Sequence, residues 1–231
     1  MTIICHQHKF IFIKTRKTAG TSIETSLARF CGDDDVITAL SDEDEAARIS
    51  AGIRSAQNLH VPLRHYGPIQ IAKLAKGERA RFYNHTPAVD VRRFVTSKQW
   101  KDYFIFCIER NPFDRAISQY FWKNRKLSHN LPSMATFFEN LSDLNMSNWN
   151  VYSDGHHPIV DQVIRYENLE RGLSEVGELL GIKIDISQIH AKGWTRTDRR
   201  SYQEVLDPES RSIIEKRCAQ EISFFGYQWG K

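Results

Sequence analysis

The chain has 231 residues, of which 41% are hydrophobic, and this is enough to bury a core, so we expect residues 1–231 to form a single domain. Its formal net charge of +4 suits anionic ligands. With 32 Lys and Arg against 28 Asp and Glu, it lacks the one-sided basic character of a nucleic-acid-binding protein. Nucleic acid is therefore not an expected partner.

The cysteines and the N-terminal segment argue against two further classes. Cys5, Cys31, Cys107 and Cys218 are scattered and form no C-x-x-C pair, so we expect buried thiols and no metal. The opening MTIICHQHKF lacks the segments of a signal peptide, and no run approaches the roughly 20 apolar residues of a membrane span. These features predict a cytoplasmic protein without a membrane span.

Residues 9–24, KFIFIKTRKTAGTSIE, predict a strand, a tight turn and the start of a helix. The apolar run of residues 10–13 is typical of a strand buried on both faces, and Thr21 and Glu24 have the order of a capping box. Such a turn directs unpaired N–H groups and the positive end of a helix dipole toward one point, which favours an anion. The alternative is an ordinary connection with a solvated lysine.

The next segments predict short helices around a long excursion. Residues 41–49 have the pattern of a short capped helix, and a second helical patch is expected at residues 69–74. Residues 50–84 mix Gly, Pro and basic residues, which is typical of an excursion that covers the core and carries substrate-binding elements. A further helix is expected to start near Pro87, with Thr86 as its cap.

Two more strands complete the expected sheet. YFIFCIER at 103–110 repeats the design of the first strand, and QVIRYE at 162–167 is a weaker candidate. A helix follows and stops at Gly181, and a C-terminal helix is expected to have Asp207 as its N-cap. Strands that alternate with helices predict an α/β fold with a central parallel sheet.

The stretch ERNPFDRAISQYFW, residues 109–122, predicts a second anion site. Arg110 ends a strand just before a helix capped by Asn111, and Ser118 lies about 9 Å further along that helix. The two can meet one phosphate, although Arg110 can equally pair with a neighbouring carboxylate. Because ligands of open α/β sheets bind at the carboxyl ends of the strands, both sites suit one ligand with two anionic groups.

These motifs resemble those of a known family. KTRKTAGTSIE resembles the 5′-phosphosulfate-binding loop of sulfotransferases, especially the PKTxxTS form of carbohydrate sulfotransferases, and RNPFDRAISQY resembles their 3′-phosphate-binding strand and helix. RYENL at 165–169 and the segment 198–227 resemble later parts of the family, so the likeness spans nearly the whole chain. The chain departs from the family at Arg16, where many members have Pro.

The resemblance implies a P-loop-NTPase-like three-layer fold, with a central parallel β-sheet flanked by helices. It also implies binding of 3′-phosphoadenosine 5′-phosphosulfate (PAPS) and transfer of its sulfuryl group to an acceptor, which leaves 3′,5′-bisphosphoadenosine (PAP). The implied residues are Arg16, Lys17, Thr18, Ala19, Gly20, Thr21 and Ser22 at the 5′-phosphosulfate, Arg110 and Ser118 at the 3′-phosphate, Tyr166 at the adenine, and Arg199 or Arg200 closing over the 3′-phosphate.

Sulfuryl transfer needs a cation at the leaving oxygen and a base for the acceptor proton. Lys17 is the expected cation. His85 resembles the histidine that carbohydrate and bacterial sulfotransferases carry between the two motifs, and we expect it to be the base, with a pKa near that of an ordinary imidazole. His60 and His65 are the alternatives. The adjacent His156 and His157 lack metal-ligand spacing.

Two other functions remain open from the sequence. A nucleotide or small-molecule kinase uses a similar cradle, but the order G-x-x-x-x-G-K-[ST] is absent because Lys17 precedes Gly20. A non-catalytic nucleotide-binding module is the other alternative. The expected acceptor is a glycan or another hydroxylated small molecule, onto which Trp100, Trp122 or Trp149 can stack.

Overall fold

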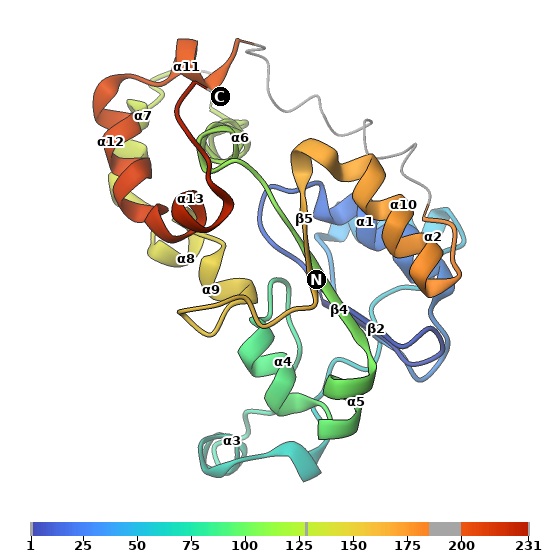
Figure 1. The fold of residues 1–231 in the computed structure, drawn as a ribbon. Helices are drawn as coiled ribbons and strands as arrows, with labels where there is room; N and C mark the ends of the chain where they lie inside the picture. The colour runs from blue at the N-terminus through green and yellow to red at the C-terminus, as the bar shows by residue number, and fades with distance from the viewer. Residues whose placement is uncertain (1, 128, 185–199, 231) are drawn as a thin grey trace.

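A five-stranded sheet lies at the centre of the computed structural model, which describes residues 2–127, 129–184 and 200–230 (Figure 1). The strand order is β3-β1-β2-β4-β5. The strands are β1 (Thr2–Cys5), β2 (Phe10–Ile13), β3 (Val36–Ile37), β4 (Phe104–Glu109) and β5 (Gln162–Arg165). β2, β4 and β5 are parallel, whereas β1 pairs antiparallel with both β2 and β3.

The three predicted parallel strands are confirmed, but the sheet as a whole is mixed. β1 and β3, which form the antiparallel edge, are not predicted by the sequence patterns. The turn between β1 and β2 contains no glycine, and Lys9 takes its left-handed backbone position with φ of 50°. Hairpin turns are usually recognised in a sequence by Gly or Asn at the positions with positive φ. This turn has neither residue, so the sequence did not indicate a hairpin.

Helices cover both faces of the sheet and make the three layers. Phe10 and Phe12 of β2 point to one face, where they pack with α1 (Gly20–Leu27) and α10 (Leu169–Leu180). Ile11 and Ile13 point to the other face, toward α4 (Ala88–Phe94) and α9 (Trp149–Tyr152). Each of these fully buried strand side chains stabilises the fold by about 1.5–3 kcal/mol. The predicted α/β fold with flanking helices is therefore confirmed.

A third cluster of helices lies beyond the carboxyl end of β4 (Figure 1). It joins α6 (Pro112–Asn124), α7 (Met134–Asn140) and α12 (Pro208–Arg217). The predicted caps are present here, since Asn111 Oδ1 accepts from Phe113 N over 3.0 Å and Asp207 Oδ1 accepts from Ser210 N over 2.7 Å. The cluster places α6 beside the polar loop that follows β2.

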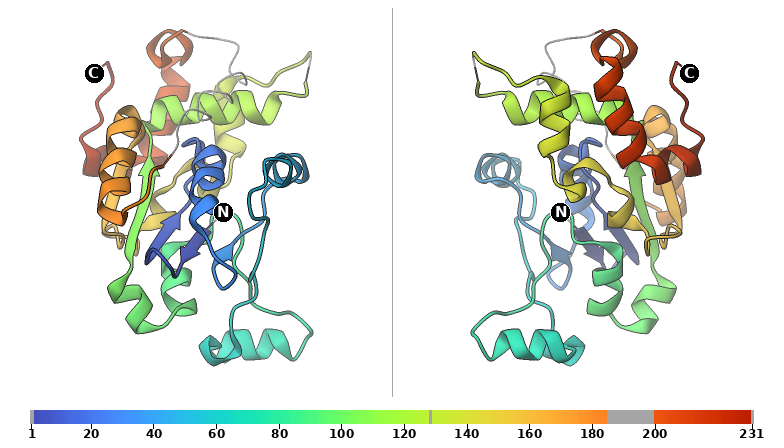
Figure 2. Two further views of the ribbon diagram at one scale, coloured as in Figure 1. Left: turned by 90° about the vertical axis from the view of Figure 1, so that its right-hand side faces the viewer. Right: turned by 90° about the vertical axis from the view of Figure 1, so that its left-hand side faces the viewer.

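The remaining helices are short. They are α2 (Asp42–Ser50), α3 (Pro68–Leu74), α5 (Ser97–Asp102), α8 (Asp143–Met146), α11 (Tyr202–Val205) and α13 (Ala219–Phe225), together with 3-10 turns at Ala28–Phe30, Leu63–His65 and Tyr166–Asn168. The first two confirm the predicted helices at 41–49 and 69–74. The segment with α3 projects from the end of the molecule opposite α12 (Figure 2). Within the described ranges, no helix has the length and apolar content needed to cross a bilayer.

The four cysteines are buried and free, as predicted. Cys5, Cys31 and Asp35 come together near the β1–β2 hairpin, with one ligand atom from each lying within 4.8 Å of the others. The Asp35 carboxylate accepts from the backbone N–H of His6 and of Gly32, over 2.6 and 2.7 Å. This contact ties the hairpin to the end of the first helical segment.

Candidate active site

The loop after β2 has a strained backbone. Lys17 and Ala19 have φ values of 61° and 58°, in the left-handed region that side chains usually avoid, and α1 begins at Gly20. The predicted capping box at Thr21 is wrong, because the Glu24 carboxylate turns into the interior and pairs with Lys14 Nζ over 2.8 Å. The helix start is therefore held by tertiary contacts instead of a local cap.

This backbone leaves a group of amides available to a ligand. In the parts of the chain that the structure describes, no residue accepts a hydrogen bond from the backbone N–H groups of residues 17 to 21. Left-handed residues within a turn direct successive N–H groups to one side, and such concavities bind anions. The positive end of the α1 dipole adds to the same potential. The loop thus has the geometry of a phosphate or sulfate cradle.

A cluster of cations surrounds Lys17. Burial, followed by the charges of Arg110, Arg125 and Lys14, lowers the pKa of the Lys17 amine to about 7. The amine lies 5.0 Å from the centre of the Trp122 ring. Because these positive charges repel one another, an anion placed among them would be stabilised strongly.

Arg110 connects the loop to α6. Its guanidinium donates to the Lys17 carbonyl over 3.2 Å, pairs with Asp114 over 2.5 Å and lies 4.4 Å from the Tyr166 ring centre. The carboxylate pairing considered from the sequence is therefore present, together with the contact to the loop. Ser118 lies one helical turn beyond Asp114 and is half-buried. The structure brings Arg110, Lys17 and Tyr166 together at the carboxyl end of the sheet.

His85 lies at the same edge. Its Nδ1 is 3.0 Å from the main-chain carbonyl of Lys14, and since a carbonyl only accepts, Nδ1 carries the proton and Nε2 keeps a lone pair. Burial above all, followed by nearby positive charges that include Lys14 and Arg16, lowers the pKa of His85 to about 2. The expected imidazole-like pKa is therefore wrong, and the ring is neutral at physiological pH.

Thr86 does not cap the helix that follows His85, in contrast to the prediction. Helix α4 starts at Ala88 with Pro87 at the N-cap. The Thr86 hydroxyl accepts from the Tyr83 N–H over 2.8 Å and donates to the Tyr83 carbonyl over 2.7 Å. It thereby closes the turn that holds His85 at a φ of 65°.

The other histidines considered as bases lie in the excursion. His60 forms an isolated bridge with Arg81. His65 lines a groove of about 740 Å³ between residues 64–70 and 92–97, next to α3. Neither makes a recorded contact with the loop after β2 in the described residues.

The three tryptophans considered for acceptor stacking lie in different environments. Trp149 is only 2% exposed and belongs to the core. Trp100 packs against the same core from its edge. Trp122 is 37% exposed and lies against Lys17, so it alone of the three flanks the loop.

Several loop residues have roles that the motif did not indicate. The Thr18 hydroxyl is buried and lies 2.9 Å from the Thr15 hydroxyl, which itself donates to the Ile108 carbonyl. A Cβ on Gly20 would lie 2.6 Å from Lys14 Cε, so this glycine makes room for the buried lysine. Ser22 is nearly buried. These contacts hold the loop against the sheet.

Three arginines were also predicted to bind the donor, namely Arg16, Arg199 and Arg200. Arg16 Nη1 is buried and has no hydrogen-bond partner among the described residues, and burial lowers the pKa of its guanidinium. Arg200 is exposed near α11. The prediction for Arg199 falls outside the described residues.

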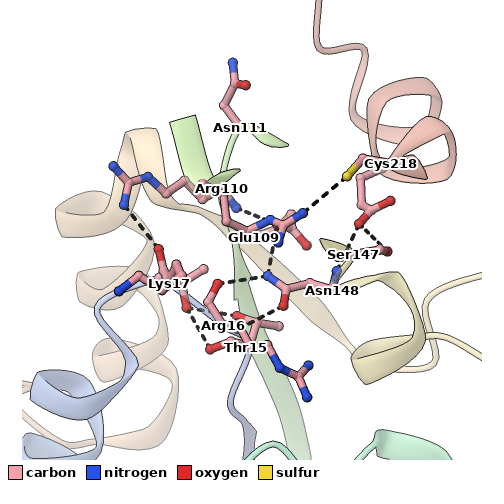
Figure 3. A network of polar contacts seen from close by, with 12 residues as sticks. Thr15, Arg16, Lys17, Glu109, Arg110, Asn111, Ser147, Asn148 and Cys218 are labelled. Atoms are coloured by element: carbon pink, nitrogen blue, oxygen red, sulfur yellow. Dashed lines mark hydrogen bonds and ion pairs between the residues drawn. The ribbon is translucent and has the colours of Figure 1, made fainter. Parts of the chain in front are cut away.

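One residue of this site was missed altogether. The Asn148 side chain accepts from Arg16 N over 2.9 Å and donates to the Arg16 carbonyl over 3.1 Å (Figure 3). Asn148 follows α8 and belongs to no motif, so only the folded chain places it against the loop. A buried network around Glu109 and Glu221 continues from it.

Comparisons with known proteins identify similar chains. A model of the sulfotransferase family matches residues 1–228. An uncharacterized protein of Archaeoglobus fulgidus is 32% identical over 100 residues, which is 42% of this chain and 82% of that protein. A crystal structure of a sulfotransferase from Alicyclobacillus acidocaldarius aligns over 94% of this chain and 95% of its own, with 14% identity and a TM-score of 0.39. Because the family model spans nearly the whole chain, this protein belongs to the sulfotransferase family.

Proposed function

We propose that this protein transfers the sulfuryl group of PAPS to a hydroxyl group of a small-molecule or glycan acceptor. The observation that carries the proposal is the loop after β2, whose backbone N–H groups from residue 17 to 21 have no acceptor among the described residues. Membership of the sulfotransferase family supplies the class of reaction. The anion cradle formed by this loop is the proposed binding site for the phosphosulfate of the donor.

The residues present fit a donor with two anionic groups. Lys17 and the amides of the loop suit the 5′-phosphosulfate, because they combine a cation with N–H groups aimed at one point. The unpartnered Nη1 of Arg16 adds a donor nearby. We assign the 3′-phosphate to Arg110 and Ser118.

Three further residues are assigned around the same nucleotide. Tyr166, already stacked with Arg110, suits the adenine. Either Arg200 or Arg199, the latter outside the described residues, is assigned to close over the 3′-phosphate. Ala19, Gly20, Thr21 and Ser22 complete the backbone of the phosphosulfate loop.

The chemistry requires one charge and one proton acceptor from the chain. PAPS, when bound, supplies an activated sulfuryl group on a phosphate leaving group. Lys17 stabilises negative charge that grows on that phosphate. Nε2 of His85 accepts the proton of the attacking hydroxyl, so that the new oxygen–sulfur bond forms without a net positive charge on the acceptor.

His85 is neutral in the free protein. A pKa of about 2 leaves its lone pair available but makes the ring a weak base, so the role requires the negative charge of the bound donor to raise that pKa and to stabilise the imidazolium that results. The Nδ1 contact with Lys14 fixes the tautomer in advance.

Comparing PAP with ATP tests the proposal most directly. PAP should raise the melting temperature of the protein, and ATP, which lacks the 3′-phosphate, should raise it much less at the same concentration. Turnover is then measured with sulfur-labelled PAPS and a panel of hydroxylated acceptors. A preference for ATP would favour a kinase, and PAP binding without transfer to any acceptor would favour a non-catalytic module.

A further inference from the structure

The amide of Asn148 is matched to the main chain of the loop. Oδ1 accepts from Arg16 N–H over 2.9 Å, and Nδ2 donates to the Arg16 carbonyl over 3.1 Å. Since a backbone N–H only donates and a carbonyl only accepts, these partners fix the orientation of the amide. The second Nδ2 hydrogen lies toward Glu109 Oε1 at 3.4 Å. Asn148 therefore holds both polar groups of the residue that precedes Lys17.

Asn148 is itself held from the C-terminal part of the chain. Oε1 of Glu221, on α13, accepts from Asn148 N over 3.0 Å and from the Ser147 hydroxyl over 2.6 Å. Glu221 and Asn148 are both buried, at 1% and 0% exposed. Ser147 and Asn148 each donate to Glu221, and Figure 3 shows the contacts that continue from Asn148 to Arg16 of the loop. A segment more than 200 residues away in sequence thus reaches the loop.

The position of this contact matters because the loop is strained. Left-handed conformations at Lys17 and Ala19 cost on the order of 1–3 kcal/mol each and persist only where neighbouring contacts enforce them. Asn148 anchors the loop on the residue before the first of them. If Arg16 were released, we would expect Lys17 and Ala19 to relax toward ordinary backbone angles and their N–H groups to turn apart.

We propose that Asn148, held by Glu221, is a positioning residue that keeps the loop of residues 16 to 21 in its anion-binding conformation. Its role in affinity rests on the proposed function, whereas its hold on the loop does not. The side chain contacts the loop backbone and is assigned no contact with substrate.

Asn148→Asp is the sharpest test. The replacement has nearly the same shape, but it sets a carboxylate oxygen against the Arg16 carbonyl and Glu109, where the native amide donates. Asn148→Ala removes the contact without adding repulsion. Gln57→Glu is the matched control, because the Gln57 amide likewise donates to main-chain carbonyls, those of Gly32 and Asp35, away from the loop.

The first measurement is limited trypsin digestion without ligand, with fragments identified by mass spectrometry. Trypsin cuts after Arg16 and Lys17, and cuts after Lys98 and Arg171, on α5 and α10, report general unfolding. We expect cleavage at the loop to rise about 10- to 100-fold in Asn148→Asp, less in Asn148→Ala, and to stay at the parent level in Gln57→Glu.

The second measurement is PAP affinity by calorimetry. We expect it to fall about 10- to 100-fold in Asn148→Asp and to stay unchanged in Gln57→Glu. Unchanged loop cleavage, or cleavage that rises equally at all four sites, overturns the proposal and makes Asn148 an ordinary core residue. If the parent protein does not bind PAP, the proposed function is wrong, but the digestion still decides the role of Asn148.

Discussion

The imidazole of His85 donates a hydrogen bond from Nδ1 to the main-chain carbonyl of Lys14, over 3.0 Å. This bond joins the residue that directly follows the excursion of residues 50–84 to the residue after β2, three residues before Lys17. It fixes the imidazole tautomer and leaves Nε2 as an acceptor. Burial and the cationic loop both disfavour the imidazolium, so His85 can take a proton from a hydroxyl group only when a bound anion offsets those charges.

Replacing His85 by Ala should lower turnover by about 10²- to 10⁴-fold, because the attacking hydroxyl loses its proton acceptor. PAP affinity should stay near that of the parent, since His85 is assigned to the acceptor proton and not to the nucleotide. Turnover with labelled PAPS and calorimetry with PAP measure the two effects. Full turnover in the variant would assign the base elsewhere, and His60 and His65 would be tested next.

The pH dependence of PAP binding should report Lys17. Its pKa of about 7 in the free protein means that the amine loses its charge as the pH rises above 7, and an anion binds only after the proton is taken up again. Affinity should therefore fall between pH 7 and 9, by up to about tenfold per pH unit. Calorimetry in buffers of different ionisation enthalpy would detect the proton uptake.

Lys17→Arg is the control for that pH dependence. A guanidinium stays charged throughout this range, so the variant should bind PAP with little change between pH 7 and 9. The same fall in both proteins would mean that another group titrates.

Arg110→Ala should weaken PAP binding, because it removes a charge-assisted contact to the 3′-phosphate. An effect of about 1.5–3 kcal/mol corresponds to roughly 10- to 100-fold in affinity. ATP binding should change less. Asp114→Asn is the matched variant, since it breaks the same ion pair and leaves the guanidinium in place.

Arg110→Ala and Asp114→Asn together distinguish a phosphate-binding role of Arg110 from a purely structural one. If Arg110 acts mainly as the partner of Asp114, both changes should lower the free energy of unfolding alike and leave PAP affinity unchanged. If it binds the phosphate, only Arg110→Ala should lose affinity. Urea unfolding and calorimetry distinguish these results.

The buried pair of Lys14 and Glu24 should contribute to stability in a way that depends on both members. The carboxylate of Glu24 is fully buried, and Lys14 is 6% exposed. Lys14→Met should lower the free energy of unfolding by about 3–5 kcal/mol, because it leaves a buried charge without its partner. The double variant Lys14→Met with Glu24→Leu should recover much of that loss. Equal losses in the single and double variants would contradict the pairing.

The sequence by itself determined the parallel part of the sheet and the two polar segments that end its strands. The unbroken apolar runs at residues 10–13 and 104–108 are typical of strands buried on both faces. The order Asn111-Pro112 indicates where α6 begins, because Asn is a favoured N-cap and Pro a favoured first residue. These signals are local, since neighbouring residues suffice to produce them. The motifs therefore suffice to place Lys17 and Arg110 in the segments that follow β2 and β4.

Two properties became clear only from the tertiary structure. They are the contacts that hold the loop after β2 and the protonation states of the residues around it. Glu24 looks like part of a cap in the sequence, yet its carboxylate pairs with Lys14 because burial makes an unpaired ammonium too costly. His85 looks like an ordinary titrating imidazole, yet burial keeps it neutral. Asn148 carries no motif, and its amide meets Arg16 only because α9 packs under the sheet. Burial and contacts between distant segments set these properties, and neither is encoded in the order of adjacent residues.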